Sequence, residues 1–371
     1  MWIRTLLCLF VVMAVAHVGP PAAAAQDATP KLEFVTEIKG LPTVAIITTG
    51  GTIAERIDPK TGGVVPALSG QDIVAAVPGL KAIANIAIME FSNIDSSQMT
   101  PRIWARLSKA TDAVLAGDDI VGAVITHGTD TMAEAAYFLD VTLKSDKPVI
   151  FTGALDDASS RELDGPANLY NAVIQVLSDN ARGWGVTVTL NRYVNSARDA
   201  RKSNTTNVQA FTSGEKGYLG YIYGNTVRRI NDRLYRRRLA LPKVVPDALP
   251  KVPFISMYAG SDGGFIRYAV DNGAQGLLVE GVGSGNVNAQ MFKAIKYALS
   301  KDIPVVVSSR VYYGSVEPVY GDVGGGKTLQ EAGCILAGDL IGTKARLLLM
   351  LGIMQYGNDS GRLKALFAQA D

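Results

Sequence analysis

The sequence predicts an α/β protein with two parts: a larger N-terminal domain, with a mostly parallel sheet flanked by helices, and a smaller C-terminal α/β domain. Short apolar runs rich in β-branched residues alternate with segments whose apolar residues recur about every 3.6 positions. This alternation is typical of βα units and favours a parallel sheet. The chain has 371 residues, 48% of them hydrophobic and 19% charged, which is enough to build two cores.

Residues 1–25 have the pattern of a secretory signal peptide. Arg4 supplies a positive start, residues 6–18 are apolar apart from His17, and the alanines at 22–25 give an A-x-A cleavage pattern. The apolar run is too short for an ordinary membrane span. The alternatives are a mitochondrial transit peptide or a retained anchor, but the segment has one Arg and no amphipathic charge pattern. We therefore expect a periplasmic or secreted protein.

The composition of the mature chain excludes several function classes. Cleavage would remove Arg4 and leave 35 of the 36 basic residues against 34 acidic ones, so we expect no bulk attraction to nucleic acid or to a membrane. Cys8 and His17 would also leave, so Cys334 and His127 would each be the sole residue of their type. We therefore expect no intrachain disulfide, no thiolate metal cluster and no multi-His metal site, and a Ser-His-Asp hydrolase would have to use His127.

Each element follows from local patterns. The helix at 101–115 begins after Thr100, a candidate N-cap, and has proline at its first position. The helix at 344–354 is almost wholly apolar after its first turn, which indicates burial. The other expected helices are 131–143, 166–177 and 287–299, and the expected strands are 44–48, 86–89, 121–126, 149–152, 186–190, 254–258, 276–279 and 305–308.

Residues 231–253 divide the chain into an N-terminal domain at 42–230 and a C-terminal domain at 254–371. The segment has no helical or strand pattern, and four arginines in it are followed by four prolines. The arginines would suit a polyanion site, but the rest of the chain is nearly neutral. We interpret the segment as a solvated linker.

Two glycine motifs resemble nucleotide-binding sequences. Residues 321–328 fit the G-x-x-x-x-G-K-[ST] pattern, but residues 317–320 make a poor strand where that motif needs a buried one. Residues 281–286 have G-x-G-x-G spacing instead of the G-x-G-x-x-G of a dinucleotide fingerprint. We interpret the first as a flexible loop and the second as a tight strand-to-helix turn.

Two threonine loops give the strongest indication of a site. "IITTGGTIA" at 46–54 and "AVITHGTDT" at 123–131 each leave an apolar strand, pass through glycine and present threonine. The carboxyl ends of parallel strands meet at one edge of a sheet, so we expect both loops there. Glycine lets the backbone approach a ligand closely and leaves N–H groups free to bind an anion.

Thr52 and Thr129 are candidates either for nucleophiles or for helix N-caps. A nucleophilic hydroxyl needs a group that takes its proton. The candidates are His127, Asp130 and a lysine with a lowered pKa. His127 precedes a glycine at a strand end, and we expect it to be a structural imidazole bonded to backbone.

"TGGTIA" at 49–54, together with "THGTDTMAEAAYFLD" at 126–140, resembles the bacterial type II L-asparaginases and glutaminase-asparaginases. The resemblance implies a large and a small α/β domain, no metal or cofactor, and a homotetramer with sites between paired subunits. It extends over nearly the whole mature chain, through residues 164–173, 198–211, 281–286, 308–311 and 344–349.

The resemblance implies an amidohydrolase that releases ammonia from L-asparagine, with L-glutamine as a second candidate substrate, through a threonine acyl-enzyme. Thr52 matches the nucleophile of the family and Thr129 its second catalytic threonine. Lys202 matches the lysine that, with Asp130, polarises the second hydroxyl.

The resemblance also implies a set of substrate-binding residues. Asp130, beside Thr129, would hold the α-ammonium group, and Ser96 would hold the α-carboxylate, with Ser97 as a neighbouring polar contact. The backbone of Ala154 would line the amide pocket, and Gly51 would let the substrate lie against bare backbone.

The sequence departs from the family in four places. The lid segment 55–70 lacks the family's tyrosine, and Tyr137 is the first tyrosine of the chain. Residues 155–157 replace a usual M-R-P, Ser284 replaces an asparagine, and residues 312–337 contain no clear match for the neighbouring subunit's glutamate. These changes predict altered rate, lid closure and substrate preference, with the nucleophile retained.

The alternative is a periplasmic amino-acid-binding protein of two lobes, or a catalytically weakened asparaginase relative. Binding proteins close around ligand at a hinge, often with several crossings between lobes. The single linker in this sequence argues against that alternative.

Overall fold

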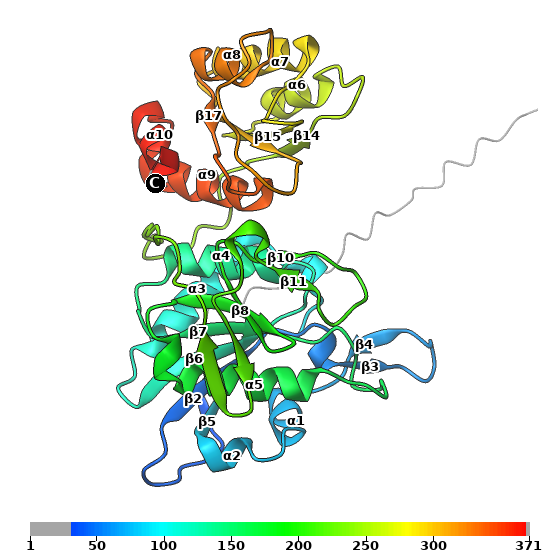
Figure 1. The fold of residues 1–371 in the computed structure, drawn as a ribbon, viewed down its shortest axis with the longest axis vertical. Helices are drawn as coiled ribbons and strands as arrows, with labels where there is room; N and C mark the ends of the chain where they lie inside the picture. The colour runs from blue at the N-terminus through cyan, green and yellow to red at the C-terminus, as the bar shows by residue number, and fades with distance from the viewer. Residues whose placement is uncertain (1–30, 369–371) are drawn as a thin grey trace, which may run out of the picture.

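The computed structural model of the protein describes residues 31–368, so the predicted signal peptide lies outside the described residues. Two domains are stacked along the long axis of the molecule (Figure 1). The larger contains a nine-stranded sheet of order β1-β5-β2-β6-β7-β8-β9-β12-β13, and the smaller a sheet of order β14-β15-β16-β17. Within residues 31–368, no helix has the length and apolar character that crossing a membrane requires.

The elements have the following bounds. The strands are β1 Glu33–Phe34, β2 Thr43–Thr48, β3 Glu55–Ile57, β4 Val64–Pro66, β5 Asn85–Glu90, β6 Ile120–Thr126, β7 Val149–Thr152, β8 Val186–Leu190, β9 Tyr193–Ser196, β10 Arg201–Lys202, β11 Phe211–Thr212, β12 Gly220–Tyr223, β13 Thr226–Arg229, β14 Phe254–Ser256, β15 Leu277–Gly281, β16 Val305–Ser309 and β17 Ile335–Leu336. The α-helices are α1 Gly70–Ala75, α2 Leu80–Ile83, α3 Pro101–Leu115, α4 Met132–Thr142, α5 Gly165–Leu177, α6 Gly264–Asp271, α7 Ala289–Leu299, α8 Gly326–Glu331, α9 Gly342–Tyr356 and α10 Ser360–Ala368. The 3₁₀ helices are η1 Thr52–Ala54, η2 Ser96–Gln98, η3 Asp179–Ala181 and η4 Gly214–Lys216.

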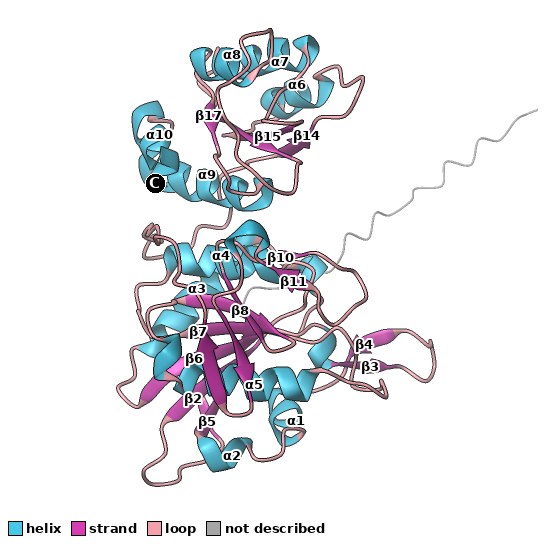
Figure 2. Ribbon diagram, in the orientation of Figure 1, coloured by secondary structure: helices cyan, strands magenta, loops and turns pink. Residues whose placement is uncertain are grey.

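The strands predicted from apolar runs form the parallel centre of the large sheet. Strands β5, β2, β6, β7 and β8 pair in parallel, and β1 and the β9-β12-β13 extension add antiparallel pairings at the two edges. Every residue of β2 is buried because helices cover both faces (Figure 2). Ala45 and Ile47 pack with α3 and α4, whereas Val44 and Ile46 pack with α1, α2 and α5.

The predicted helices are present, with ends that differ by a few residues. Thr100 caps α3 by accepting a hydrogen bond from the backbone N–H of Ile103. Helix α9 is buried over most of its length, as its apolar sequence indicates, because it packs on α4 of the large domain as well as on its own sheet. Cys334, just before β17, is 1% exposed, and burial raises the pKa of its thiol to about 12.

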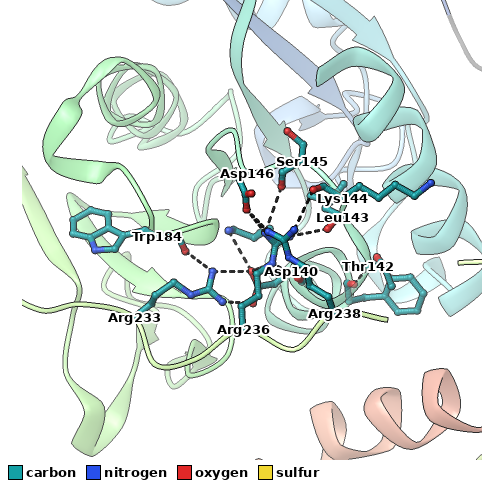
Figure 3. Close-up of polar contacts among 12 residues, drawn as sticks. Asp140, Thr142, Leu143, Lys144, Ser145, Asp146, Trp184, Arg233, Arg236 and Arg238 are labelled. Atoms are coloured by element: carbon teal, nitrogen blue, oxygen red, sulfur yellow. Dashed lines mark hydrogen bonds and ion pairs between the residues drawn. The ribbon is translucent and has the colours of Figure 1, made fainter. Parts of the chain in front are cut away.

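Residues 231–253 connect the two domains and many of them are exposed, but the expectation of a solvated segment is wrong for three of its arginines. Arg233 and Arg236 form ion pairs with Asp140 at the end of α4 (Figure 3). Arg237 is 7% exposed and donates hydrogen bonds to carbonyls of α10. Asp140 is itself 4% exposed, and a buried carboxylate needs compensating cations. The segment is therefore held to the large domain through Asp140 and to the small domain through α10.

A buried lysine joins the two domains. Lys344, in the first turn of α9, is fully buried, and its Nζ donates to the carbonyl oxygens of Arg198 (2.8 Å) and Ala200 (2.6 Å). Burial lowers the pKa of Lys344 to about 7. A neutral amine has two N–H groups, which suits two carbonyl acceptors. The small domain thus holds the segment that leads into β10.

Lys344→Met tests this arrangement through the pH dependence of the free energy of unfolding. Between pH 7 and 10.5 the unfolded chain binds a proton on Lys344 that the folded chain has released. Stability therefore rises with pH across that window, by about 1.4 kcal/mol per pH unit from this residue, and the methionine variant lacks that slope. Urea unfolding at pH 7.5 and 9.0 should show a difference between wild type and variant that is larger at pH 9.0.

Lys81→Met, at an exposed position of α2, controls for the loss of a lysine as such. A difference between wild type and Lys344→Met that is equal at both pH values would contradict the assignment.

Candidate active site

The ends of three adjacent parallel strands form the floor of the site. Thr48 of β2 lies opposite Thr126 of β6, which lies opposite Thr152 of β7. Beyond β2, the Thr49 hydroxyl donates to the carbonyl of Thr126 at 2.8 Å. Both threonine loops therefore leave the sheet at the same edge, as their sequences predict.

Glycine allows these loops to contact one another through backbone. Gly51 has a φ of +82°, and a Cβ added there would lie 2.3 Å from the Cα of Gly128. A Cβ added at Gly128 would lie 2.7 Å from the Oγ of Ser96. Real side chains do not tolerate such approaches. Glycine at both positions therefore brings the loop of Thr52, the loop of Thr129 and the segment of Ser96 together.

Lys202 joins Thr129 to Asp130. Its Nζ donates to Thr129 Oγ1 at 2.9 Å and to Asp130 Oδ1 at 2.5 Å. Lys202 lies in β10, which pairs with β11 through Phe211. An ammonium group only donates hydrogen bonds, so the Thr129 oxygen is the acceptor and its own proton points elsewhere. The structure thus brings together the Thr-Asp-Lys set that the resemblance implies.

The other predicted substrate residues surround this cluster. Ser96 is 2% exposed, and its carbonyl accepts a 2.8 Å hydrogen bond from the Thr131 hydroxyl. Ser97 is exposed, and its backbone N–H donates to Asp95 at 2.7 Å. The Ala154 side chain is packed in the core, so its contribution to a pocket would come from backbone.

His127 is a structural residue, as predicted. Its ring is fully buried, and Nδ1 lies 2.7 Å from the carbonyl oxygen of Gly128, to which it donates. Burial lowers its pKa to about 4, so the imidazole is neutral near pH 7. A ring fixed to backbone in this way is not placed to take a proton from Thr52 or Thr129.

The sequence argument missed Glu55. Thr52 is the first residue of η1, and its hydroxyl interacts with the side chain of Glu55, which is 7% exposed. Burial raises the pKa of Glu55, and the charges of Asp95, Asp157 and Asp130 add to the rise. The available signal was an acidic residue three positions after Thr52, where a 3₁₀ turn aligns side chains.

The lid segment forms the β3–β4 hairpin. Ile57, Val64 and Val65 are exposed on it, and the hairpin projects from the side of the large domain (Figure 2). Tyr137 lies within α4 and is 2% exposed, so it cannot serve on a lid. The hairpin therefore supplies no aromatic hydroxyl.

The two nucleotide-like motifs have structural roles. The strand before α8, β16, ends at Ser309, well before the phosphate-loop pattern, and α8 contains only six residues and begins at Gly326 within that pattern. In the other motif, Val282 bridges to Asn286 in a tight turn. Ser284 accepts a 2.9 Å hydrogen bond from the backbone of Glu317 and so ties this turn to the following long loop.

The fold and cluster define a two-domain α/β protein in which threonine, lysine and carboxylate groups meet at the edge of a parallel sheet. The family model for the asparaginase N-terminal domain matches residues 43–235, and that for the glutaminase/asparaginase C-terminal domain matches residues 251–367. The chain belongs to the asparaginase family.

Relatives of known sequence and structure agree with this membership. The chain is 39% identical to a probable periplasmic L-asparaginase of Haemophilus influenzae over 319 residues, covering 85% of this chain and 89% of the relative. It is 37% identical to L-asparaginase 2 of Escherichia coli over 340 residues, covering 89% and 93%. A crystal structure of a probable cytoplasmic L-asparaginase from Campylobacter jejuni superposes with a TM-score of 0.81 at 37% identity, covering 88% of this chain and 99% of that one.

Gly51→Ala tests the contact between the loops. Alanine must adopt a φ of +82° with a ψ of 178°, a conformation essentially restricted to glycine that costs about 1–3 kcal/mol, and its methyl group must also displace the backbone of Gly128. Such overpacking adds about 1–3 kcal/mol. We expect thermal unfolding to show a large loss of stability.

Gly40→Ala is the matched control because Gly40 has a φ of +90° with nothing within 4 Å of the added Cβ. Gly40→Ala also places alanine at a positive φ, but without the clash. Equal losses of stability in the two variants would show that the approach of the loops is not the constraint.

Proposed function

We propose that this protein is an amidohydrolase that releases ammonia from L-asparagine, with L-glutamine as a second candidate substrate, through an acyl-enzyme on Thr52. One observation carries the proposal: Lys202 Nζ bridges Thr129 Oγ1 and Asp130 Oδ1 at the sheet edge that the Thr52 loop shares. Relatives named L-asparaginase cover most of the chain and support the substrate class.

Each residue of the site has its own role in the proposed reaction. Thr52 attacks the side-chain amide carbon, and backbone N–H groups of the glycine loops stabilise the oxyanion. Ammonia leaves, and a water molecule then hydrolyses the Thr52 ester. Thr129 and Lys202 lie next to the ester during this step. Asp130 holds the substrate's α-ammonium group and Ser96 its α-carboxylate, because opposite charge and hydroxyl donors favour these groups.

Assembly and location form part of the proposal. Four aromatic side chains are exposed on the small domain: Phe254, Tyr258, Phe265 and Tyr268. Exposed apolar patches of this kind mark protein interfaces. This group supports a homotetramer, which the resemblance implies. The N-terminal pattern and the Haemophilus influenzae relative, named periplasmic, support export, although the Campylobacter jejuni structure is described as that of a cytoplasmic protein.

Thr52→Ala tests the nucleophile. The variant should release no measurable ammonia from L-asparagine or L-glutamine, because no acyl-enzyme can form, and should unfold at the wild-type temperature. Thr226→Ala, at an exposed position of β13, is the matched control and should retain wild-type turnover. Turnover by Thr52→Ala equal to wild type would refute the assignment.

L-Aspartate binding separates an enzyme from an amino-acid-binding protein. A thermal-shift scan of the wild type with L-aspartate reports occupation of the site whether or not catalysis occurs. Stabilisation without ammonia release would favour the binding protein or the weakened relative. The buried contacts of Lys344 between the domains argue against hinge closure of that kind.

A further inference from the structure

The reaction proposed above assigns no role to Glu55. A threonine hydroxyl becomes a nucleophile when a neighbouring group removes its proton. Segment 55–70 has no tyrosine, His127 is fixed to backbone, and Lys202 is paired with Thr129 and Asp130. The carboxylate that interacts with the Thr52 hydroxyl is that of Glu55.

The backbone sets this pairing. Residues 52–54 form the 3₁₀ turn η1, and the Glu55 N–H donates to the carbonyl of Thr52. Side chains three residues apart eclipse one another in a 3₁₀ turn. The Glu55 side chain therefore lies over that of Thr52, and it is 7% exposed while its β3 neighbours Arg56 and Ile57 face solvent.

Hydrogen bonds on both sides hold the base of the hairpin. The Ala158 N–H donates to the Glu55 carbonyl at 3.0 Å, and the Ile57 N–H donates to Ser159 Oγ at 3.1 Å. On the other side, the N–H groups of residues 67 and 68 both donate to the Ala54 carbonyl at 2.9 Å. The carboxylate is thus carried by a fixed part of the hairpin, so its contact with Thr52 does not depend on the exposed tip.

The surroundings make Glu55 a better base than an ordinary carboxylate. Burial raises its pKa most, and the charges of Asp95, Asp157 and Asp130 raise it further, while the interaction with the Thr52 hydroxyl opposes the rise in pKa. These carboxylates come from the segment before η2, the β7–α5 loop and the β6–α4 loop, and Lys202 pairs with Asp130. A general base works best when its pKa approaches the working pH.

We propose that Glu55 is the catalytic base for Thr52 in this chain, supplied within one subunit by the residue that begins the lid hairpin. This inference rests on the proposed amidohydrolase function and adds to it the group that moves the proton. It also accounts for how the nucleophile can work although segment 55–70 has no tyrosine.

The proton balance is closed. As the Thr52 oxygen forms a bond to the amide carbon, its proton passes to Glu55 and the carbonyl electrons move onto oxygen. When the tetrahedral intermediate collapses, the C–N bond breaks and Glu55 returns the proton to the departing nitrogen, giving ammonia and the Thr52 ester. Water then attacks the ester and Glu55 takes a proton from it, returning it to the Thr52 oxygen as the ester bond breaks.

Glu55→Gln tests the role with little structural change. The amide oxygen can still accept the Thr52 hydroxyl, and no charge remains to be buried, so the unfolding temperature should equal or exceed that of the wild type. We expect kcat/KM for L-asparagine to fall about 10²- to 10⁴-fold, the usual contribution of general acid–base catalysis. The acid limb of the pH–rate profile should disappear with it.

Asp157→Asn is the matched variant. It removes one of the like charges near Glu55 but no contact with Thr52. The acid limb of its pH–rate profile should shift to lower pH, while the rate on the plateau stays close to wild type. A merely structural Glu55 would not link the titration of the reaction to a charge on another loop.

The outcomes distinguish this inference from the function on which it rests. A folded wild type that releases no ammonia from L-asparagine or L-glutamine overturns both. An active wild type with a Glu55→Gln variant of equal kcat/KM and an unchanged pH profile overturns the role of Glu55 alone. A large loss in Glu55→Gln with a preserved unfolding temperature, together with a shifted limb in Asp157→Asn, supports it.

Discussion

The site depends on one backbone contact, the approach of Gly51 to Gly128. The two loops leave neighbouring parallel strands; a side chain at Gly51 would separate them, and one at Gly128 would collide with Ser96. Because the contact is made without side chains, the residues that follow each glycine are fixed in relation to the other loop. Thr52 and Thr129 obtain their places in this way.

The junction between the two domains fixes the position of Lys202. Lys202 sits on a two-residue strand that would be weak alone, since short isolated pairs are marginally stable. Lys344 reaches from α9 to the carbonyls of residues 198 and 200, and the linker arginines bind Asp140. These buried polar groups are all partnered, as burial requires. The small domain therefore acts on the chemistry by holding β10, although Lys344 lies outside the threonine cluster.

The sequence predicted the parts of the fold that repeat a strong local pattern. The apolar runs identified β2, β6 and β7, and proline after Thr100 located the start of α3. The β8–β9 hairpin was missed because its turn uses Asn191 and Arg192 at positive φ, without the glycine that usually marks such turns. The arginines were read as solvated because their partner, Asp140, lies far away along the chain. Glu55 was missed because its role arises from the 3₁₀ turn and from charges on three other loops, and no spacing within its own segment reveals them.

The buried thiol of Cys334 has a practical consequence for observing the lid. Its raised pKa and lack of exposure keep it protonated and out of contact with alkylating reagents while the protein is folded. In a chain lacking residues 1–25, a cysteine introduced at Thr61, on the exposed hairpin tip, would then be the one thiol open to a fluorescent label. Movement of the hairpin could be followed spectroscopically in this way without removing any native cysteine.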